Sequence, residues 1–159
     1  MMQVIPRLVI SGADAAIDFY QRAFAAKVMS RYTGPDGSVV NADLRIGESL
    51  LTLKDADDVD RSATSYGGSP VLLMLVVADA DAVAAAMIAA GARVIFSVSD
   101  QSYGYRQGRL ADPFGYQWLL SQDIEELTPE QTQDRLDSQR STGCGRLSTD
   151  RIAVVRRTQ

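Results

Sequence analysis

The sequence predicts an α+β fold of two tandem βαβββ modules, whose strands form a curled mixed sheet with a concave trough and with the helices outside. Three observations predict it. Strand-like and helix-like segments follow one another in the order β-α-β-β-β, this order occurs twice, and a shift of 67 positions aligns the two halves. The chain has 159 residues, 46% of them hydrophobic, which is enough for one domain with a substantial core.

Module one is expected at residues 4–54. An apolar run at 4–10 predicts a strand, and apolar residues at helical spacing predict a helix at 13–26. Ser11 precedes that helix and is expected to be its N-cap. Alternating patterns and turn residues then predict three strands, at 27–33, 38–46 and 49–54.

Module two is expected at 70–127, after an acidic, Gly/Ser-rich linker at 55–69 that forms a loop or flap. The continuous apolar run at 70–77 is typical of a strand buried on both faces. The Ala-rich stretch at 79–90 predicts a helix, which Gly91 ends in the left-handed conformation. Three further strands are expected, at 93–98, 103–112 and 116–121.

The internal repeat rests on identities as well as on the order of elements. The first strand and helix of the two halves coincide at Val9 and Val76, Ala13 and Ala80, Asp14 and Asp81, Ala15 and Ala82, Ala23 and Ala90, and Ala25 and Ala92. One such unit cannot bury its apolar face alone. We therefore expect the two sheets to curl beside one another and to leave a trough of the concave kind that ligands favour.

Composition argues against several functions. The net charge of −4 and the absence of a basic patch speak against a nucleic-acid partner, and no apolar run reaches the roughly 18 residues of a membrane span. The chain has no histidine, which removes the commonest transition-metal ligand and the usual base of Ser/His/Asp and Cys/His catalysis. The single Cys144 and the lack of a signal-peptide pattern favour a cytoplasmic protein.

The predicted strand at 38–46 carries the first candidate binding residues. Asn41, Asp43 and Arg45 share one face, while small apolar residues alternate onto the other face, toward a helix. In a curled sheet the face opposite the helix is the trough. We therefore expect these three side chains to line a ligand pocket, with an Arg45–Asp43 ion pair possible there. The alternative is a plain solvated surface.

Module two offers a richer set of candidates. Tyr103, Tyr105, Gln107 and Arg109 alternate onto one face of the predicted strand at 103–112, and Trp118 lies on the next strand. Aromatic rings beside an amide and a guanidinium suit a flat, partly polar ligand, held by stacking and hydrogen bonds. We expect Tyr103, Tyr105, Gln107 and Trp118 to bind such a ligand. For Trp118 the alternative is a place in the core.

Four segments together resemble a known family. They are SGADAAIDFYQRAFAAKV (11–28), NADLRIGESLLTL (41–53), VVADADAVAAAMIAAGARV (76–94) and YGYRQGRLADPFGYQWLL (103–120). The combination of an FYxxxF helix with a DPFGYxW turn resembles the vicinal oxygen chelate superfamily, which includes glyoxalase I, extradiol dioxygenases and bleomycin-resistance proteins, and above all its PhnB-like branch. Over residues 4–127 this resemblance implies paired βαβββ modules, a ligand trough in the curled sheet and a homodimer.

The resemblance also raises the question of a metal. Metal-dependent members hold a divalent ion with His, Glu or Gln on the first and last strands of each module. The matching places here are occupied by Arg7, Leu8, Thr52, Leu72, Leu73, Met74, Leu119 and Leu120. A catalytic site needs about three protein ligands, and Asp43 is the only good donor nearby. We therefore expect neither a metal nor another cofactor.

The sequence thus predicts a metal-free protein that binds an aromatic or antibiotic-like small molecule, with sequestration as the expected role and with no catalytic residues. The alternatives are a metal-dependent lyase, isomerase or dioxygenase of the same superfamily, and a structural or regulatory protein with an empty trough. Beyond the domain at 1–127, residues 128–159 are expected to form a polar helix that begins at Thr128 and a tail. Within that tail, 152–157 could add an edge strand.

Overall fold

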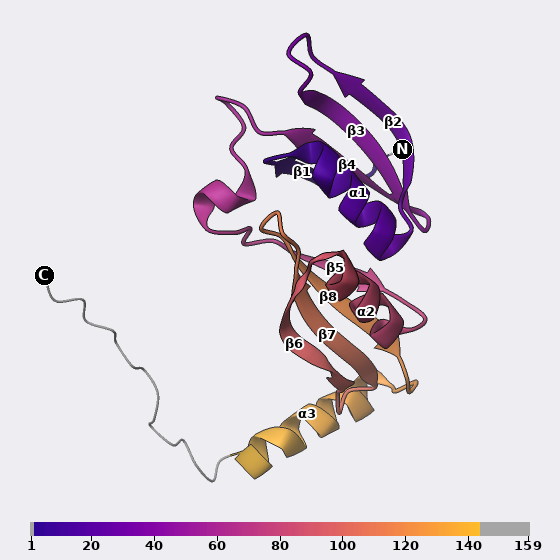
Figure 1. Cartoon of the computed structure of the whole chain (residues 1–159). Coiled ribbons are helices and arrows are strands. Elements are labelled where there is room, and N and C mark those ends of the chain that lie inside the picture. The colour runs from indigo at the N-terminus through magenta and orange to yellow at the C-terminus, as the bar shows by residue number, and fades with distance from the viewer. Residues whose placement is uncertain (1, 144–159) are drawn as a thin grey trace, which may run out of the picture.

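The computed structural model describes residues 2–143, and their elements follow the predicted order (Figure 1). Module one consists of β1 (Arg7–Ile10), α1 (Ala13–Phe24), β2 (Lys27–Thr33), β3 (Val39–Ile46) and β4 (Ser49–Asp55). The linker contains a short 3-10 helix, η1 (Ala63–Tyr66), which the sequence did not predict. Module two consists of β5 (Leu72–Val76), α2 (Ala80–Ala90), β6 (Arg93–Asp100), β7 (Tyr105–Ala111) and β8 (Gln117–Asp123). The described part ends with α3 (Pro129–Gly143).

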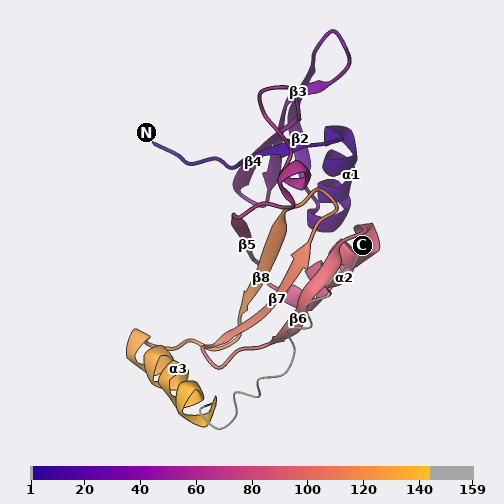
Figure 2. The same ribbon diagram turned by 90° about the vertical axis from the view of Figure 1, so that its left-hand side faces the viewer.

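The predicted fold class is confirmed. Each module forms a mixed four-stranded sheet, in the orders β1-β4-β3-β2 and β5-β8-β7-β6. In both sheets the first strand pairs parallel with the last, and the other pairs are antiparallel. Among the described residues no strand pairing joins the two sheets. Figure 2 shows α1 and α2 on the same side of the molecule, so both sheets turn their other face away from the helices. We call these two surfaces the open faces.

The start of α1 differs from the prediction. Its N-cap is Gly12, at φ 89°, rather than Ser11, and no side chain of its own caps it. Asp55, at the end of β4, supplies the cap instead: its Oδ1 accepts from the backbone N–H groups of Gly12 (3.2 Å) and Ala13 (2.7 Å). The end of α2 agrees with the prediction, because Gly91 adopts φ 113° there.

An aromatic cluster joins the two modules on the helix side. Phe19, Tyr20 and Phe24 project from α1 toward the turn before β8 and toward β8 itself. The ring centroids of Phe24 and Trp118 lie 4.8 Å apart, those of Tyr20 and Trp118 5.6 Å, and those of Phe19 and Phe114 5.9 Å. Burial of such rings contributes hydrophobic stabilisation to the interface between the modules. The helix and the turn that carry the family resemblance are therefore packed against each other.

The carboxylate of Asp112 lies at the centre of this cluster and is buried. Its Oδ1 accepts from the backbone N–H groups of Phe114 (2.9 Å) and Tyr116 (3.0 Å) and so caps the DPFG turn. Its Oδ2 accepts from Tyr20 Oη (2.8 Å), in the other module, and from Trp118 Nε1 (2.9 Å). Burial, with a smaller effect of the Asp112 charge, raises the pKa of Tyr20 well above 10, so Tyr20 keeps its donor proton.

Beyond β8, α3 begins as predicted. The Thr128 hydroxyl accepts from the backbone N–H of Gln131 (3.2 Å), as an N-cap does. Arg135 then fastens the helix to the preceding segment, with Nη1 and Nη2 at 2.6 and 2.7 Å from the Glu125 carboxylate. None of the described helices is long and apolar enough to cross a membrane. Cys144 and the segment 152–157 lie outside the described residues.

We expect the substitution Asp112→Asn to lower the free energy of unfolding by about 3 kcal/mol, because a neutral amide accepts the four donors more weakly and points its own N–H₂ group at some of them. Urea denaturation followed by circular dichroism measures the change. Asp123→Asn, at an exposed position on β8, is the matched control and should stay within about 0.5 kcal/mol of the wild type. Equal stabilities of the two variants would contradict the role assigned to Asp112.

Candidate functional site

The open face of module one carries a row of polar side chains that crosses all four strands. Ser30, Asp43, Thr52 and Arg7 are successive register partners on β2, β3, β4 and β1. Side chains of register partners point to the same face. We call these four residues the polar row. Asn41 lies on the same face, two residues from Asp43 on β3.

Hydrogen bonds satisfy most of this polar row internally. Asp43 accepts from Ser30 Oγ (2.6 Å) and from Asn41 Nδ2 (3.2 Å). Arg7 donates to Asn41 Oδ1 (2.6 Å), to Thr52 Oγ1 (3.1 Å) and to the backbone carbonyl of Val40 (3.1 Å). The expected ion pair between Asp43 and Arg45 is not formed among the described residues, and Arg45 is exposed.

The open face of module two has a row at the corresponding register, but its chemistry differs. Phe96, Arg109, Leu119 and Met74 are successive partners on β6, β7, β8 and β5. We call these four residues the mixed row, because a single guanidinium stands among apolar side chains. Met74 and Phe96 are 59% and 62% exposed, so this row is largely uncovered.

A short hydrogen-bond chain runs beside the mixed row. Tyr103 Oη donates to Gln107 Oε1 (2.9 Å), and Gln107 Nε2 donates to Ser121 Oγ (2.9 Å). The rings of Tyr103 and Tyr105 are tilted against each other with centroids 6.0 Å apart. The sequence placed Tyr105, Gln107 and Arg109 on one face, and the alternation of β7 puts them there. The structure therefore brings Tyr103, Tyr105 and Gln107 together.

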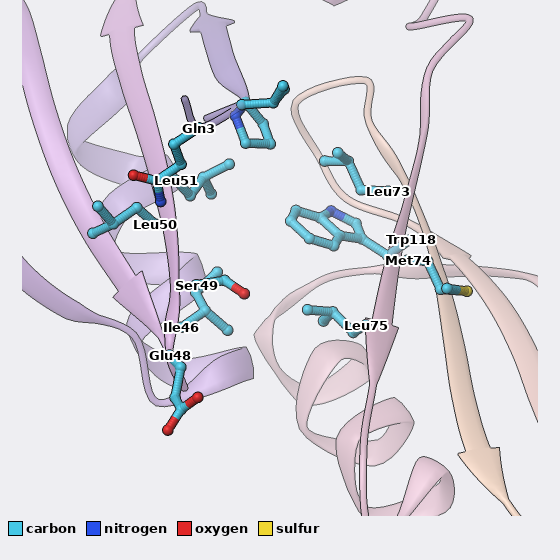
Figure 3. Close-up of a pocket in the computed structure, with 12 residues that line it drawn as sticks. Gln3, Ile46, Glu48, Ser49, Leu50, Leu51, Leu73, Met74, Leu75 and Trp118 are labelled. Atoms are coloured by element: carbon cyan, nitrogen blue, oxygen red, sulfur yellow. The ribbon is translucent and has the colours of Figure 1, made fainter. Parts of the chain in front are cut away.

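Trp118 lies elsewhere. It is 3% exposed, bonds to Asp112 and packs on the aromatic rings of α1, so it faces the helix side of its sheet. Trp118 also lines a cavity of about 330 Å³ between the modules, whose lining includes polar residues such as Glu48 and Ser49. Figure 3 shows Trp118 pointing across this cavity together with Leu73 and Leu75, while Met74 points the other way. The seven predicted binding residues thus fall in three places: two open faces and the contact between modules.

Several participants were not among the seven predicted binding residues. In the polar row these are Arg7, Ser30 and Thr52, and in module two they are Met74, Phe96, Arg109, Leu119 and Ser121. Arg7 and Thr52 had been considered only as poor metal ligands, although strand alternation puts both on the face of Asp43. Ser30 and Phe96 each sit next to a register irregularity, between Val28 and Ser30 and between Val94 and Phe96. An irregularity of this kind shifts the side-chain alternation, so their faces could not be read from the sequence.

The two rows also occupy the first and last strands of each module, where the metal-dependent relatives carry their ligands. Here those strands present Arg7 and Thr52 in one module and Met74 and Leu119 in the other. A guanidinium is cationic and donates only, and leucine has no donor atom for a metal. Within residues 2–143 no three His, Cys, Asp or Glu side chains are grouped closely enough to hold a metal ion. The residues present do not fit a divalent metal.

The arrangement of two βαβββ modules with helices on one side defines a class of protein, and sequence comparison identifies it. Residues 4–120 match the Glyoxalase/Bleomycin resistance protein/Dioxygenase superfamily, and the chain belongs to this superfamily. A relative in Mycobacterium bovis, the uncharacterized protein Mb0911c, is 40% identical over 141 residues, which cover 84% of this chain and 91% of the relative.

Solved structures share the fold. The gene product At5g48480 of Arabidopsis thaliana superposes with a TM-score of 0.63 at 25% identity, covering 76% of this chain and 98% of that one. A PhnB protein of Bacillus cereus gives 0.59 at 13% identity, over 76% and 99%. TnmS3, an antibiotic binding protein from Streptomyces sp. CB03234, gives 0.58 at 20% identity, over 77% and 97%. At such low identities the last two comparisons establish the fold alone.

We expect Zn²⁺, Ni²⁺ and Mn²⁺ not to bind the polar row stoichiometrically, because Asp43 alone offers a carboxylate and Arg7 places a positive charge nearby. Isothermal titration of each metal into the purified protein, followed by metal analysis after gel filtration, tests this. Uptake of one ion per chain that disappears in the Asp43→Asn variant would refute the expectation. Asp123→Asn is the matched control, since Asp123 is an exposed carboxylate on the other sheet.

Proposed function

We propose that the protein binds a small, partly aromatic organic molecule on its open faces, without a metal ion and without chemical conversion. The observation that carries the proposal is the make-up of module two's open face. Exposed apolar side chains of the mixed row lie beside the Tyr103–Gln107–Ser121 hydrogen-bond chain and a guanidinium. A mostly apolar surface with a few fixed polar groups is typical of small-molecule sites.

The polar row supports binding rather than catalysis. A general base must be free to accept a proton from its substrate, whereas Asp43 accepts from Ser30 and Asn41. Retention of a ligand requires no free base, only apolar surface and matching polar groups, and the open face of module two has both. The likeness to TnmS3, described as an antibiotic binding protein, favours an antibiotic-like compound as the class of ligand and sequestration as the role.

We further propose that the chain forms a homodimer in which a second copy covers the open faces. Val76 (69% exposed), Phe96 (62%) and Met74 (59%) all lie on the open side of module two's sheet. Apolar side chains that are exposed together mark an interaction surface. A second copy over this face would also enclose a ligand, which one chain alone leaves accessible to solvent.

The ligand prediction is tested with a panel of planar aromatic compounds of two to four fused rings. A bound compound stabilises the folded state, by about 2.7 kcal/mol at a concentration of 100 times its Kd, and therefore raises the unfolding midpoint. We expect at least one compound to do so, and the double substitution Met74→Ala, Phe96→Ala to reduce the shift by more than half. Val59→Ala, in the exposed linker, should leave it unchanged. No shift across the panel would refute the proposal.

The dimer prediction is tested by sedimentation velocity. We expect the wild-type chain to sediment as a dimer, and Val76→Glu to weaken association at least tenfold, because each interface would then bury two unpaired carboxylates. Val59→Glu introduces the same charge at a more exposed linker position and should leave association unchanged. A monomeric wild-type protein at 50 times the concentration used for ligand binding would contradict the proposed dimer.

A further inference from the structure

Arg109 differs from the eight other arginines between Arg7 and Arg135. Five have bonded partners: Arg7, Arg22, Arg31, Arg106 and Arg135. Three are exposed to solvent: Arg45, Arg61 and Arg93. Arg109 is only partly exposed, and its Nε is buried without a hydrogen-bond partner, a state that only Ser102 Oγ shares among the described side chains. A buried donor without an acceptor is unfavourable unless something else supplies the acceptor.

The surroundings of Arg109 make its charge effective. The Cζ atom lies 5.5 Å from the ring centroid of Phe96, in a cation–π contact. Its register partner on β8 is Leu119, and Met74 follows on β5, so apolar side chains occupy the rest of the mixed row. The nearest carboxylate position on this face of β8 is Asp123, four residues beyond Leu119 or roughly 13 Å at the rise of a strand. A cation in such weakly polar surroundings attracts an anion more strongly than one in water.

Module one does not compete for the same anion. At the corresponding register it has Asp43 rather than an arginine, and the guanidinium of its polar row, Arg7, already donates to three oxygen acceptors. Binding an anion there would require breaking these bonds, whereas Arg109 has no such bonds to lose. Arg45, on the same face of module one, is exposed to water, which weakens its attraction for an anion. The two halves of the repeat therefore differ in the group that they leave available.

We propose that Arg109 is the anion-binding residue of the ligand site, and that the ligand is a planar aromatic compound carrying a carboxylate or a comparable oxyanion. This inference rests on the function proposed above and narrows it to a chemical class. The oxyanion accepts hydrogen bonds from the Arg109 guanidinium, whose fork of donors matches a carboxylate. The aromatic body lies over the apolar side chains of Phe96, Leu119 and Met74.

Two probes of the same shape test this inference: naphthalene-2-carboxylate and its neutral counterpart naphthalene-2-carboxamide. Isothermal titration of the full chain at pH 7 should show the carboxylate binding at least tenfold more tightly than the amide. Arg109→Gln should abolish this preference while leaving the amide affinity within about twofold. Arg93→Gln removes an exposed arginine on the same face of the same sheet and should retain the preference. An unchanged urea midpoint establishes that Arg109→Gln is folded.

The outcomes separate the inference from the function on which it rests. Equal binding of both probes, or a preference that survives Arg109→Gln, overturns the anion site and leaves small-molecule binding intact. If neither probe binds and no compound of the panel raises the unfolding midpoint, both the anion site and the proposed small-molecule binding are overturned. Sedimentation tests the alternative that a second copy of the chain, rather than a ligand, supplies the anion at Arg109. If Arg109→Gln weakens dimerisation tenfold without altering the preference between the two probes, the anion is a carboxylate of the second copy. The ligand inference then fails.

Discussion

The four hydrogen bonds that converge on the Asp112 carboxylate hold this molecule in its arrangement. No described strand pairing joins the two sheets, so contacts other than sheet hydrogen bonds keep the modules in their relative position. One carboxylate receives donors from the DPFG turn, from β8 and from α1, and thereby joins three segments of two modules. A hydroxyl–backbone pair between Tyr116 and Val9 (3.0 and 3.1 Å) provides a second link. Each buried polar group is satisfied here, which is the condition for such a network to stabilise a fold.

This arrangement separates structural from binding residues by face. The aromatic contacts and the Asp112 hydrogen bonds that join the modules lie on the helix side, where Trp118, Tyr20 and Asp112 are buried together. The open faces take no part in them. Side chains of β3 and β7 can therefore differ on the open side without disturbing the junction. The same division explains why Trp118, which has the largest aromatic ring system in the chain, stabilises the junction and takes no place on an open face.

The period of two in a strand is what made much of the site predictable. It put Asn41, Asp43 and Arg45 on the side opposite the apolar residues of β3, and Tyr105, Gln107 and Arg109 together on β7. The side on which Trp118 lies could not be obtained in this way. Trp118 lies on the helix side because its register partners are Leu110 and Leu73, which are apolar residues of that side. The register between two strands joined by a turn cannot be read from either strand alone. The cap of α1 was missed for a similar reason, since Asp55 lies 42 residues beyond Ala13.

The repeat explains why a ligand should prefer one half of the molecule. Two identical units would offer two equivalent rows, but here the row of module one is a closed set of donors and acceptors. A ligand that binds there must replace hydrogen bonds that already exist, and the exchange gains little. The row of module two has one donor group without an acceptor and exposed apolar side chains on either side of it. A ligand that binds there gives the Arg109 guanidinium an acceptor and removes apolar surface from water, and both changes favour binding. The difference between an acceptor at Asp43 and a donor at Arg109, at the same register of the same fold, is what turns a symmetric scaffold into an asymmetric binding surface.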